Sequence, residues 1–167
     1  MDLYGIVVYP LIYIFPAYAA NGAPILFGGR GGPLDFGRRF RHRRVFGDNK
    51  TIGGTISALI AGIFVGLIYI QFPQLGFMLP IAIMLTLGAI FGDLLGSFIK
   101  RQLNLRSGTS FPIMDQYGFY IFALLFAFWL GYLPSLYGLV FITILTGVLH
   151  VFTNRGAHRL SLKKVPW

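Results

Sequence analysis

The sequence predicts an all-α membrane protein with about five transmembrane helices, built as a single polytopic domain over residues 1–167. Two observations predict this fold class. Hydrophobic residues make up 56% of the chain and charged residues only 11%, which is about half of the charge that a soluble domain uses to cover its surface. The charged residues also fall into three separate blocks, and the apolar stretches between them have lengths that suit membrane-spanning helices.

Three long stretches contain no Asp, Glu, Lys or Arg: residues 3–29, 51–92 and 116–154. A helix that crosses about 30 Å of hydrocarbon needs about 20 apolar residues, so the first stretch holds one span and each of the others holds two. Turn-forming residues stand in the middle of both longer stretches, around Pro73 and Pro134. The predicted spans are near 3–20, 52–71, 77–96, 117–133 and 136–153.

Five alternating spans place all three charged blocks, each of them net positive, on one face of the bilayer. The positive-inside rule then puts the N-terminus outside and the C-terminus in the cytoplasm, with cytoplasmic loops near 21–51 and 97–116. We therefore expect a multi-pass protein of the cell membrane whose functional site faces the cytoplasm. The basic balance favours anionic headgroups or phosphorylated substrates as partners, not nucleic acid. The sequence does not determine the oligomeric state.

The first span contains Pro10 and Pro16, which predict a kink, and the cluster Asn21–Pro24 predicts a turn that ends it. Small residues recur at every fourth position in the second and third spans, which predicts close approach between helix backbones in lipid. The small residues are Gly54, Ala58, Gly62 and Gly66 in the second span, and Gly88, Gly92 and Gly96 in the third.

An ionisable residue, Asp93, lies near the cytoplasmic end of the third span, where such a residue indicates function. Offsets of four, seven and eight residues place Ser97, Lys100 and Arg101 on the same helical face as Asp93. A carboxylate, a hydroxyl and two cations in a row suit a metal-bound polyphosphate. The alternative is a salt bridge that anchors the end of the helix.

A second carboxylate, Asp115, stands where the fourth span is expected to begin. Two carboxylates at one membrane depth, on neighbouring helix ends, suit a shared Mg²⁺, which proteins usually hold with one or two carboxylates together with phosphates and waters. The alternative for Asp115 is a plain helix N-cap. The three histidines lack metal-ligand spacing, and the chain has no cysteine.

Lys50 and Thr51 open the second span. A helix amino terminus offers free N–H groups and a positive dipole, and Lys50 adds a point charge, so this position suits a phosphate group. Thr51 has two open interpretations, a phosphate ligand or a plain helix cap.

Taken together and in this order, the motifs of the chain resemble those of the archaeal CDP-archaeol synthases. The resemblance covers the whole chain in span layout and residues 21–116 in motif. The motifs are Asn21-x-x-Pro24, Asp35-Phe36-Gly37, Phe46-Gly47-Asp48-x-Lys50-Thr51-x-Gly53, Gly92-Asp93-x-x-x-Ser97-Phe98-x-Lys100-Arg101 and Pro112-x-x-Asp115-Gln116.

The resemblance implies a nucleotidyltransferase of phospholipid biosynthesis that transfers CMP from CTP to an isoprenoid glycerol-phosphate ether lipid, with Mg²⁺ as cofactor. The products are a CDP-archaeol-type lipid and pyrophosphate. The family pattern often has a second acidic residue three positions after the Asp that matches Asp115, and here that position is Gly118. The resemblance assigns metal binding to Asp93 and Asp115, catalytic contacts also to Lys100 and Arg101, phosphate contacts to Lys50, Thr51 and Ser97, and the nucleotide cavity to Asn21 and Pro24.

Three other functions stay open at this point. The same reaction on phosphatidic acid would use similar active-site residues, so only the lipid-facing groove would distinguish it. A small transporter is less favoured, because no charged residue lies at mid-membrane in any predicted span. A non-catalytic membrane scaffold would leave the alignment of Asp93 with Ser97, Lys100 and Arg101 unexplained.

Overall fold

Five long helices and one short hairpin make up the described part of the chain, residues 2–27, 30–105, 109 and 111–162, in a computed structural model. A π-helical segment, η1 (Tyr4–Val8), leads into the first helix, and a 3-10 turn, η2 (Pro73–Leu75), joins the second helix to the third. Strands β1 (Arg39–Phe40) and β2 (Arg43–Arg44) pair antiparallel. The helices are α1 (Tyr9–Phe27), α2 (Ile52–Tyr69), α3 (Met78–Gln102), α4 (Pro112–Phe128) and α5 (Leu136–Arg159).

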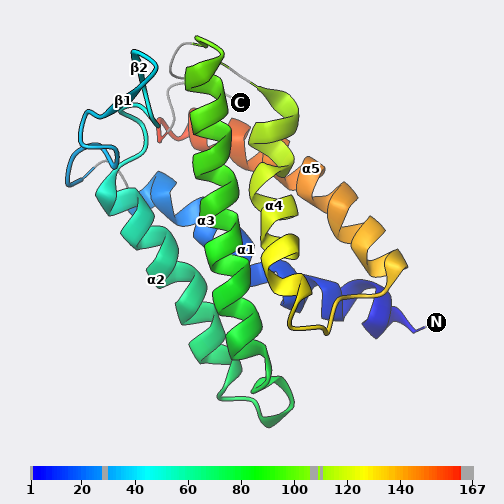
Figure 1. Ribbon diagram of the computed structural model, residues 1–167. Helices are drawn as coiled ribbons and strands as arrows, with labels where there is room; N and C mark the ends of the chain where they lie inside the picture. The colour runs from blue at the N-terminus through cyan, green and yellow to red at the C-terminus, as the bar shows by residue number, and fades with distance from the viewer. Residues whose placement is uncertain (1, 28–29, 106–108, 110, 163–167) are drawn as a thin grey trace.

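Four segments are long and apolar enough to cross a membrane: Tyr4–Phe27, Ile52–Tyr69, Met78–Gln102 and Leu136–Arg159. Helix α4 adds the shorter apolar segment Ile113–Phe128. The predicted all-α membrane fold and its number of helices are therefore confirmed. In Figure 1 the hairpin and the end of α3 lie at the top, whereas the α2–α3 connection lies at the bottom and the N-terminus at the lower right.

Three predicted boundaries of the spans are wrong, the end of the first span and both ends of the fourth. Helix α1 does not turn at Asn21–Pro24 but continues to Phe27, so the first loop begins later than predicted. Membrane helices tolerate such Gly and Pro residues where neighbouring helices and side chains satisfy the freed backbone groups. The fourth span begins at Pro112 instead of near 117 and ends at Phe128, because the chain then turns through left-handed conformations at Gly131 and Tyr132. The predicted loop near 97–116 lies partly outside the described residues.

Four of the seven small-residue positions, Gly62, Gly66, Gly88 and Gly92, are confirmed as packing seams, whereas Gly54 and Ala58 line the pocket described below. A Cβ atom added at Gly88 or Gly92 would lie only 2.3 Å from a backbone oxygen of α4, that of Phe122 or Gly118 respectively. On α2, a Cβ atom at Gly62 would lie 2.1 Å from the hydroxyl oxygen of Thr86 on α3. Helix α3 therefore lies in close contact with α2 on one side and α4 on the other (Figure 1).

Candidate functional site

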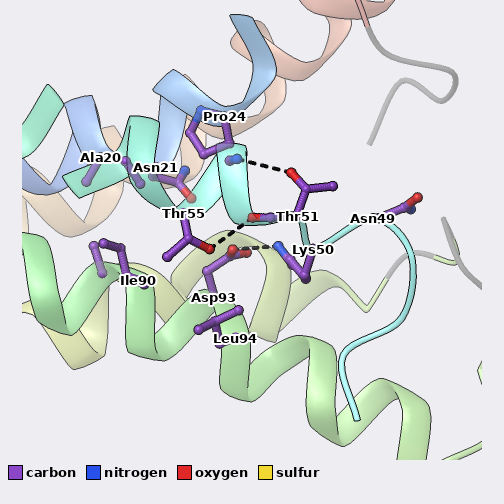
Figure 2. Close-up of a pocket in the computed structure, with 13 residues that line it drawn as sticks. Ala20, Asn21, Pro24, Asn49, Lys50, Thr51, Thr55, Ile90, Asp93 and Leu94 are labelled. Atoms are coloured by element: carbon purple, nitrogen blue, oxygen red, sulfur yellow. Dashed lines mark hydrogen bonds and ion pairs between the residues drawn. The ribbon is translucent and has the colours of Figure 1, made fainter. Parts of the chain in front are cut away.

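A pocket opens between helices α1, α2 and α3, at the end of the bundle where the loop before α2 joins its helix (Figure 2). The space that it encloses, open solvent at its mouth included, is about 510 Å³. The lining residues are Ala20, Asn21 and Pro24 from α1; Asn49, Lys50 and Thr51 from the loop; Gly54, Thr55 and Ala58 from α2; and Ala89, Ile90, Asp93 and Leu94 from α3.

The start of helix α2 forms one wall of this pocket, and its first N–H groups are already bonded. The hydroxyl of Thr51 accepts the N–H of Gly54 at 3.0 Å, so Thr51 is a helix N-cap. The N–H groups of Ile52 and Gly53 donate to carbonyl oxygens of residues 30–32, at 3.1 and 3.0 Å. The expectation of free N–H groups for phosphate at this helix end is therefore wrong, and anion binding there depends on side chains.

The pocket holds one ion pair between two of the predicted site residues. Nζ of Lys50 lies 2.5 Å from Oδ2 of Asp93, and the two side chains face each other in Figure 2. The Asp93 side chain remains 43% exposed and that of Lys50 24% exposed. Both charges therefore stay accessible from the pocket, so a ligand with its own charges can compete for either partner.

A second ion pair joins α3 to the beginning of α4. Nζ of Lys100 lies 2.7 Å from Oδ1 of Asp115, and Oδ2 of Asp115 accepts the N–H of Phe111 at 2.9 Å. Asp115 is not the N-cap of α4, a position that Phe111 occupies, but lies in the first turn and bonds back to Phe111. The described residues that line the pocket do not include Asp115 or Lys100.

Arg101, the residue after Lys100 on α3, lies against the loop that leads to Lys50. A Cβ atom at Gly47, where φ is +85°, would lie 3.4 Å from Cδ of Arg101. Among the described residues, the buried Nε of Arg101 has no hydrogen-bond partner. An unpaired guanidinium N–H favours an anionic ligand, because phosphate matches the guanidinium geometry. Ser97 is buried one turn before this position.

Asp35 is the centre of the loop that carries Lys50. Its side chain is 1% exposed and accepts hydrogen bonds from the Arg44 guanidinium, the closest at 2.6 Å. It also accepts backbone N–H groups from Gly37, Phe46 and Gly47, at 3.0–3.1 Å. These bonds fix the chain shortly before Lys50.

The charge of Asp35 is stabilised by this arrangement. Burial alone would raise the pKa of Asp35, but the hydrogen bonds from Arg44 and from three backbone N–H groups outweigh it. The pKa of Asp35 therefore lies well below its usual range. The motif Asp35-Phe36-Gly37 was part of the family resemblance, but nothing in the sequence alone assigned Asp35 a structural role.

Five of the nine predicted site residues line the pocket, and the other four lie outside its lining. Asn21, Pro24, Lys50, Thr51 and Asp93 line the pocket. Ser97, Lys100 and Arg101 lie on the following turns of α3, and Asp115 begins α4. Sequence reasoning did not single out Thr55, which lines the pocket one turn after Thr51 and donates to the Thr51 carbonyl at 3.1 Å. The four-residue spacing between Thr51 and Thr55, which places both residues on one side of the helix, could have identified Thr55 from the sequence.

Comparisons with known proteins agree with this arrangement. A family model described as CarS-like, CDP-archaeol synthase, matches residues 3–167. A CDP-archaeol synthase of Pyrococcus abyssi is 44% identical over 161 residues, which covers 93% of this chain and 95% of the relative. A CDP-archaeol synthase of Sulfolobus acidocaldarius is 41% identical over 159 residues, covering 94% and 96% of the two chains.

A solved structure has the same fold. It is described as an intramembrane enzyme for archaeal membrane lipids biosynthesis. The match has a TM-score of 0.78 at 34% identity and covers 86% of this chain and 91% of that chain. With a family model over nearly its whole length and relatives above 40% identity, the chain belongs to the CDP-archaeol synthase family.

Proposed function

We propose that the pocket between α1, α2 and α3 binds CTP and that the enzyme transfers its CMP group to an isoprenoid glycerol-phosphate ether lipid. Membership of the CDP-archaeol synthase family makes this chain a membrane cytidylyltransferase of archaeal lipid biosynthesis. The observation that supports the location of the site is the accessible Lys50–Asp93 pair, which lies in the pocket between α1, α2 and α3.

The reaction needs positioning and charge neutralisation more than a covalent nucleophile. A phosphate oxygen of the lipid attacks the α-phosphorus of CTP, the bond from this phosphorus to the bridging oxygen of the β-phosphate breaks, and pyrophosphate leaves. Catalysis of such transfers depends chiefly on alignment and on cations placed where negative charge develops. In this chain Lys50 lies in the pocket, and the buried Nε of Arg101 lies on the α3 face beside it. In this proposal both side chains contact the triphosphate.

Asp93 and Asp115 are the proposed ligands of Mg²⁺. The described residues contain no group of three or more His, Cys, Asp or Glu side chains that would hold a metal by themselves. The donor set still fits Mg²⁺, because one or two carboxylates suffice when phosphates and waters complete its six ligands. Asp93 offers its carboxylate inside the pocket, whereas Asp115 must first release Lys100. A bound Mg²⁺ would neutralise phosphate charge.

The isoprenoid lipid is the favoured acceptor. The relatives described above are archaeal CDP-archaeol synthases, so they do not favour phosphatidic acid, a transporter or a scaffold. The site lies at one end of a bundle of apolar helices, where a lipid headgroup can approach from the bilayer. Because the hairpin and the loop before α2 hold most of the arginines, we assign this end to the cytoplasm.

A reconstitution experiment tests the function. Purified protein would receive Mg²⁺ and CTP with either unsaturated archaeal lipid phosphate or phosphatidic acid, and mass spectrometry would identify the lipid product. We expect a CDP-lipid with the archaeal substrate and much less with phosphatidic acid. The absence of any CDP-lipid would contradict the proposal, and equal use of both lipids would contradict the assigned acceptor.

A further inference from the structure

The hairpin before α2 turns through two residues that rarely adopt its backbone conformation. Strands β1 and β2 are joined by Arg41 and His42 alone, and both residues have positive φ angles, 48° and 66°. A two-residue hairpin turn with positive φ at both central positions is a type I′ turn, which strongly favours Asn and Gly. Arginine and histidine are therefore strained here, and strained residues of this kind cluster at functional sites.

Most arginines of the hairpin have no acidic partner. The two acidic residues of this loop, Asp35 and Asp48, both bond to Arg44. The Arg43 guanidinium donates to the carbonyl of Gln102 at the end of α3. Three further arginines are exposed and form no ion pair with any described residue: Arg38, Arg39 and Arg41. Their charge is therefore available to a partner outside the chain.

Aromatic contacts hold the hairpin against α3. The ring centroid of Phe40 lies 5.8 Å from that of Phe98 on α3, and the Arg41 guanidinium lies 5.5 Å from the Phe40 centroid. Phe40 nevertheless stays 47% exposed. Phe36, in the turn before β1, is 74% exposed and also has a positive φ, 50°. The hairpin therefore presents two aromatic rings together with unpaired cations at its surface.

The hairpin lies at the level where the membrane spans end. It belongs to the loop between α1, which ends at Phe27, and α2, which begins at Ile52, and both helices are apolar and long enough to cross a membrane. Leu26 and Phe27 are 63% and 66% exposed, so the apolar surface of α1 continues up to this loop. In Figure 1 the hairpin lies at the top, together with the end of α3. A hairpin at this level is within reach of the headgroups of the surrounding lipids.

We propose that the tip of the hairpin, Phe36 and residues 38–42, binds the anionic headgroups of the bilayer that surrounds the protein. Guanidinium groups match phosphate oxygens in both geometry and charge. Exposed aromatic rings beside such cations are typical of segments that lie at the boundary between headgroups and acyl chains. The tip does not line the pocket, and it needs only a phosphate diester, so this inference does not depend on the proposed function.

A role in membrane topology alone does not explain the tip. Arginines in a cytoplasmic loop also fix the orientation of a membrane protein, but that role depends on how many of them the loop carries near its spans. An arginine at an unstrained position of the same loop would serve it equally well, with Asn and Gly in the turn. The strained position of Arg41 therefore favours a specific contact at the tip.

Spin-labelled lipids test the inference with the full-length protein in phosphatidylcholine vesicles. Electron paramagnetic resonance measures how strongly the protein restricts spin-labelled phosphatidylglycerol relative to spin-labelled phosphatidylcholine. Wild-type protein should favour phosphatidylglycerol by about three- to fivefold at low salt, since one arginine near an anionic surface gives about a fivefold gain in binding. This preference should fall below about 1.5-fold in 1 M salt, where screening acts over about 3 Å.

The turn offers a variant that should lose lipid binding without losing stability. Arg41→Asn with His42→Gly introduces the residues that a type I′ turn prefers, so the melting temperature in detergent should not fall. The preference for phosphatidylglycerol should nevertheless drop by at least about twofold, because a cation at the tip is lost. Arg38→Gln with Arg39→Gln should lower it by at least as much. An unchanged preference in the turn variant would overturn the inference.

The end of α5 supplies a matched control. Arg155 and Arg159 are exposed there, so Arg155→Gln with Arg159→Gln removes two positive charges outside the hairpin. Its preference for phosphatidylglycerol should stay close to that of wild type. An equal loss in this variant and in Arg38→Gln with Arg39→Gln would show that lipid preference follows net charge alone, which would overturn the inference. If the tip instead binds a soluble acidic protein, wild-type protein will show no preference for phosphatidylglycerol, and this result would overturn it as well.

Discussion

Two helix starts at the same end of the molecule each lie beside a lysine–aspartate pair, and they use their polar residues differently. At the start of α2, Thr51 caps the helix, while the adjacent Lys50 pairs with Asp93 of α3. At the start of α4, Asp115 itself accepts the N–H of Phe111 and also pairs with Lys100 of α3. The hydrogen bond at the helix start and the ion pair are thus made by two residues, Thr51 and Lys50, at α2, and by Asp115 alone at α4.

This division decides which carboxylate is available to a ligand. Lys50 is the one partner the structure shows for the Asp93 carboxylate among the described residues, and the Asp93 side chain is 43% exposed in the pocket. Both oxygens of Asp115 accept hydrogen bonds, and its side chain is 26% exposed. A metal ion that binds Asp93 displaces one ammonium group, whereas at Asp115 it also disturbs the bond at the start of a helix. The predictions below test this difference.

The largest effect is expected for Asp93→Asn. This change keeps the shape of the side chain but removes the negative charge from the pocket, so turnover should fall by a factor of about 10²–10³. The melting temperature should stay within a few degrees of wild type, because Asp93 caps no helix. CDP-lipid formation across a Mg²⁺ titration, beside a thermal melt, measures both quantities.

Asp2→Asn is the control, because Asp2 lies near the N-terminus and, among the described residues, its side chain bonds to the N–H of Gly5 alone. It should leave turnover unchanged. Near-normal turnover in Asp93→Asn, or a loss of turnover that simply follows a loss of folded protein, would remove Asp93 from the proposed metal site.

A smaller loss of activity and a larger loss of stability are expected for Asp115→Asn. The change breaks the pair with Lys100 and weakens the bond to Phe111 at the start of α4. In wild-type protein, metal binding at Asp115 must first break its pair with Lys100, so this aspartate contributes less to metal binding than Asp93. Turnover of Asp115→Asn should therefore fall by only about tenfold. The melting temperature should drop more than in Asp93→Asn. Equal activity losses of 10²-fold or more would instead support a Mg²⁺ shared equally by both aspartates.

The number of helices and the polar face were predictable because charge is expensive inside a bilayer, which forces the charged residues into blocks. The end of α1 was not predictable. Asn21, Gly22 and Pro24 are turn-formers in isolation, and only the packing of α1 along α2 and α3 explains why the helix continues. Asp35 was missed for a related reason, since its partners Arg44, Phe46 and Gly47 reach it only after the hairpin folds back.

Asp35→Asn should act on the pocket indirectly, through the position of Lys50. The neutral amide cannot accept from Arg44 and three backbone N–H groups as the carboxylate does, so the loop before α2 should loosen. We expect a severalfold rise in KM for CTP and a melting temperature lower by about 5 °C.

The pH dependence of that change distinguishes the loss of charge from a loss of packing. The folded-state pKa of Asp35 is depressed, so its contribution to stability is complete above the ordinary Asp pKa of about 3.9 and decreases as pH falls below it. The difference in melting temperature between wild type and Asp35→Asn should therefore be constant from pH 8 to pH 5 and shrink in more acidic buffer. A difference that is the same at all pH values would show that the charge of Asp35 is not responsible.

The smallest effect concerns Thr51, and it tests whether capping and ligand binding are truly separate at the start of α2. Thr51→Ala removes the hydroxyl that accepts the N–H of Gly54, which should cost about 1 kcal/mol and lower the melting temperature by about 2–4 °C. Thr51→Ser keeps a capping hydroxyl and should restore most of the stability. If Thr51 only caps the helix, turnover at saturating CTP should stay within about threefold of wild type in both variants, because Lys50 and Asp93 are retained. A large loss of turnover in Thr51→Ala at unchanged melting temperature would instead identify the Thr51 hydroxyl as a ligand of the triphosphate, and the contrast with Asp115 would then no longer hold.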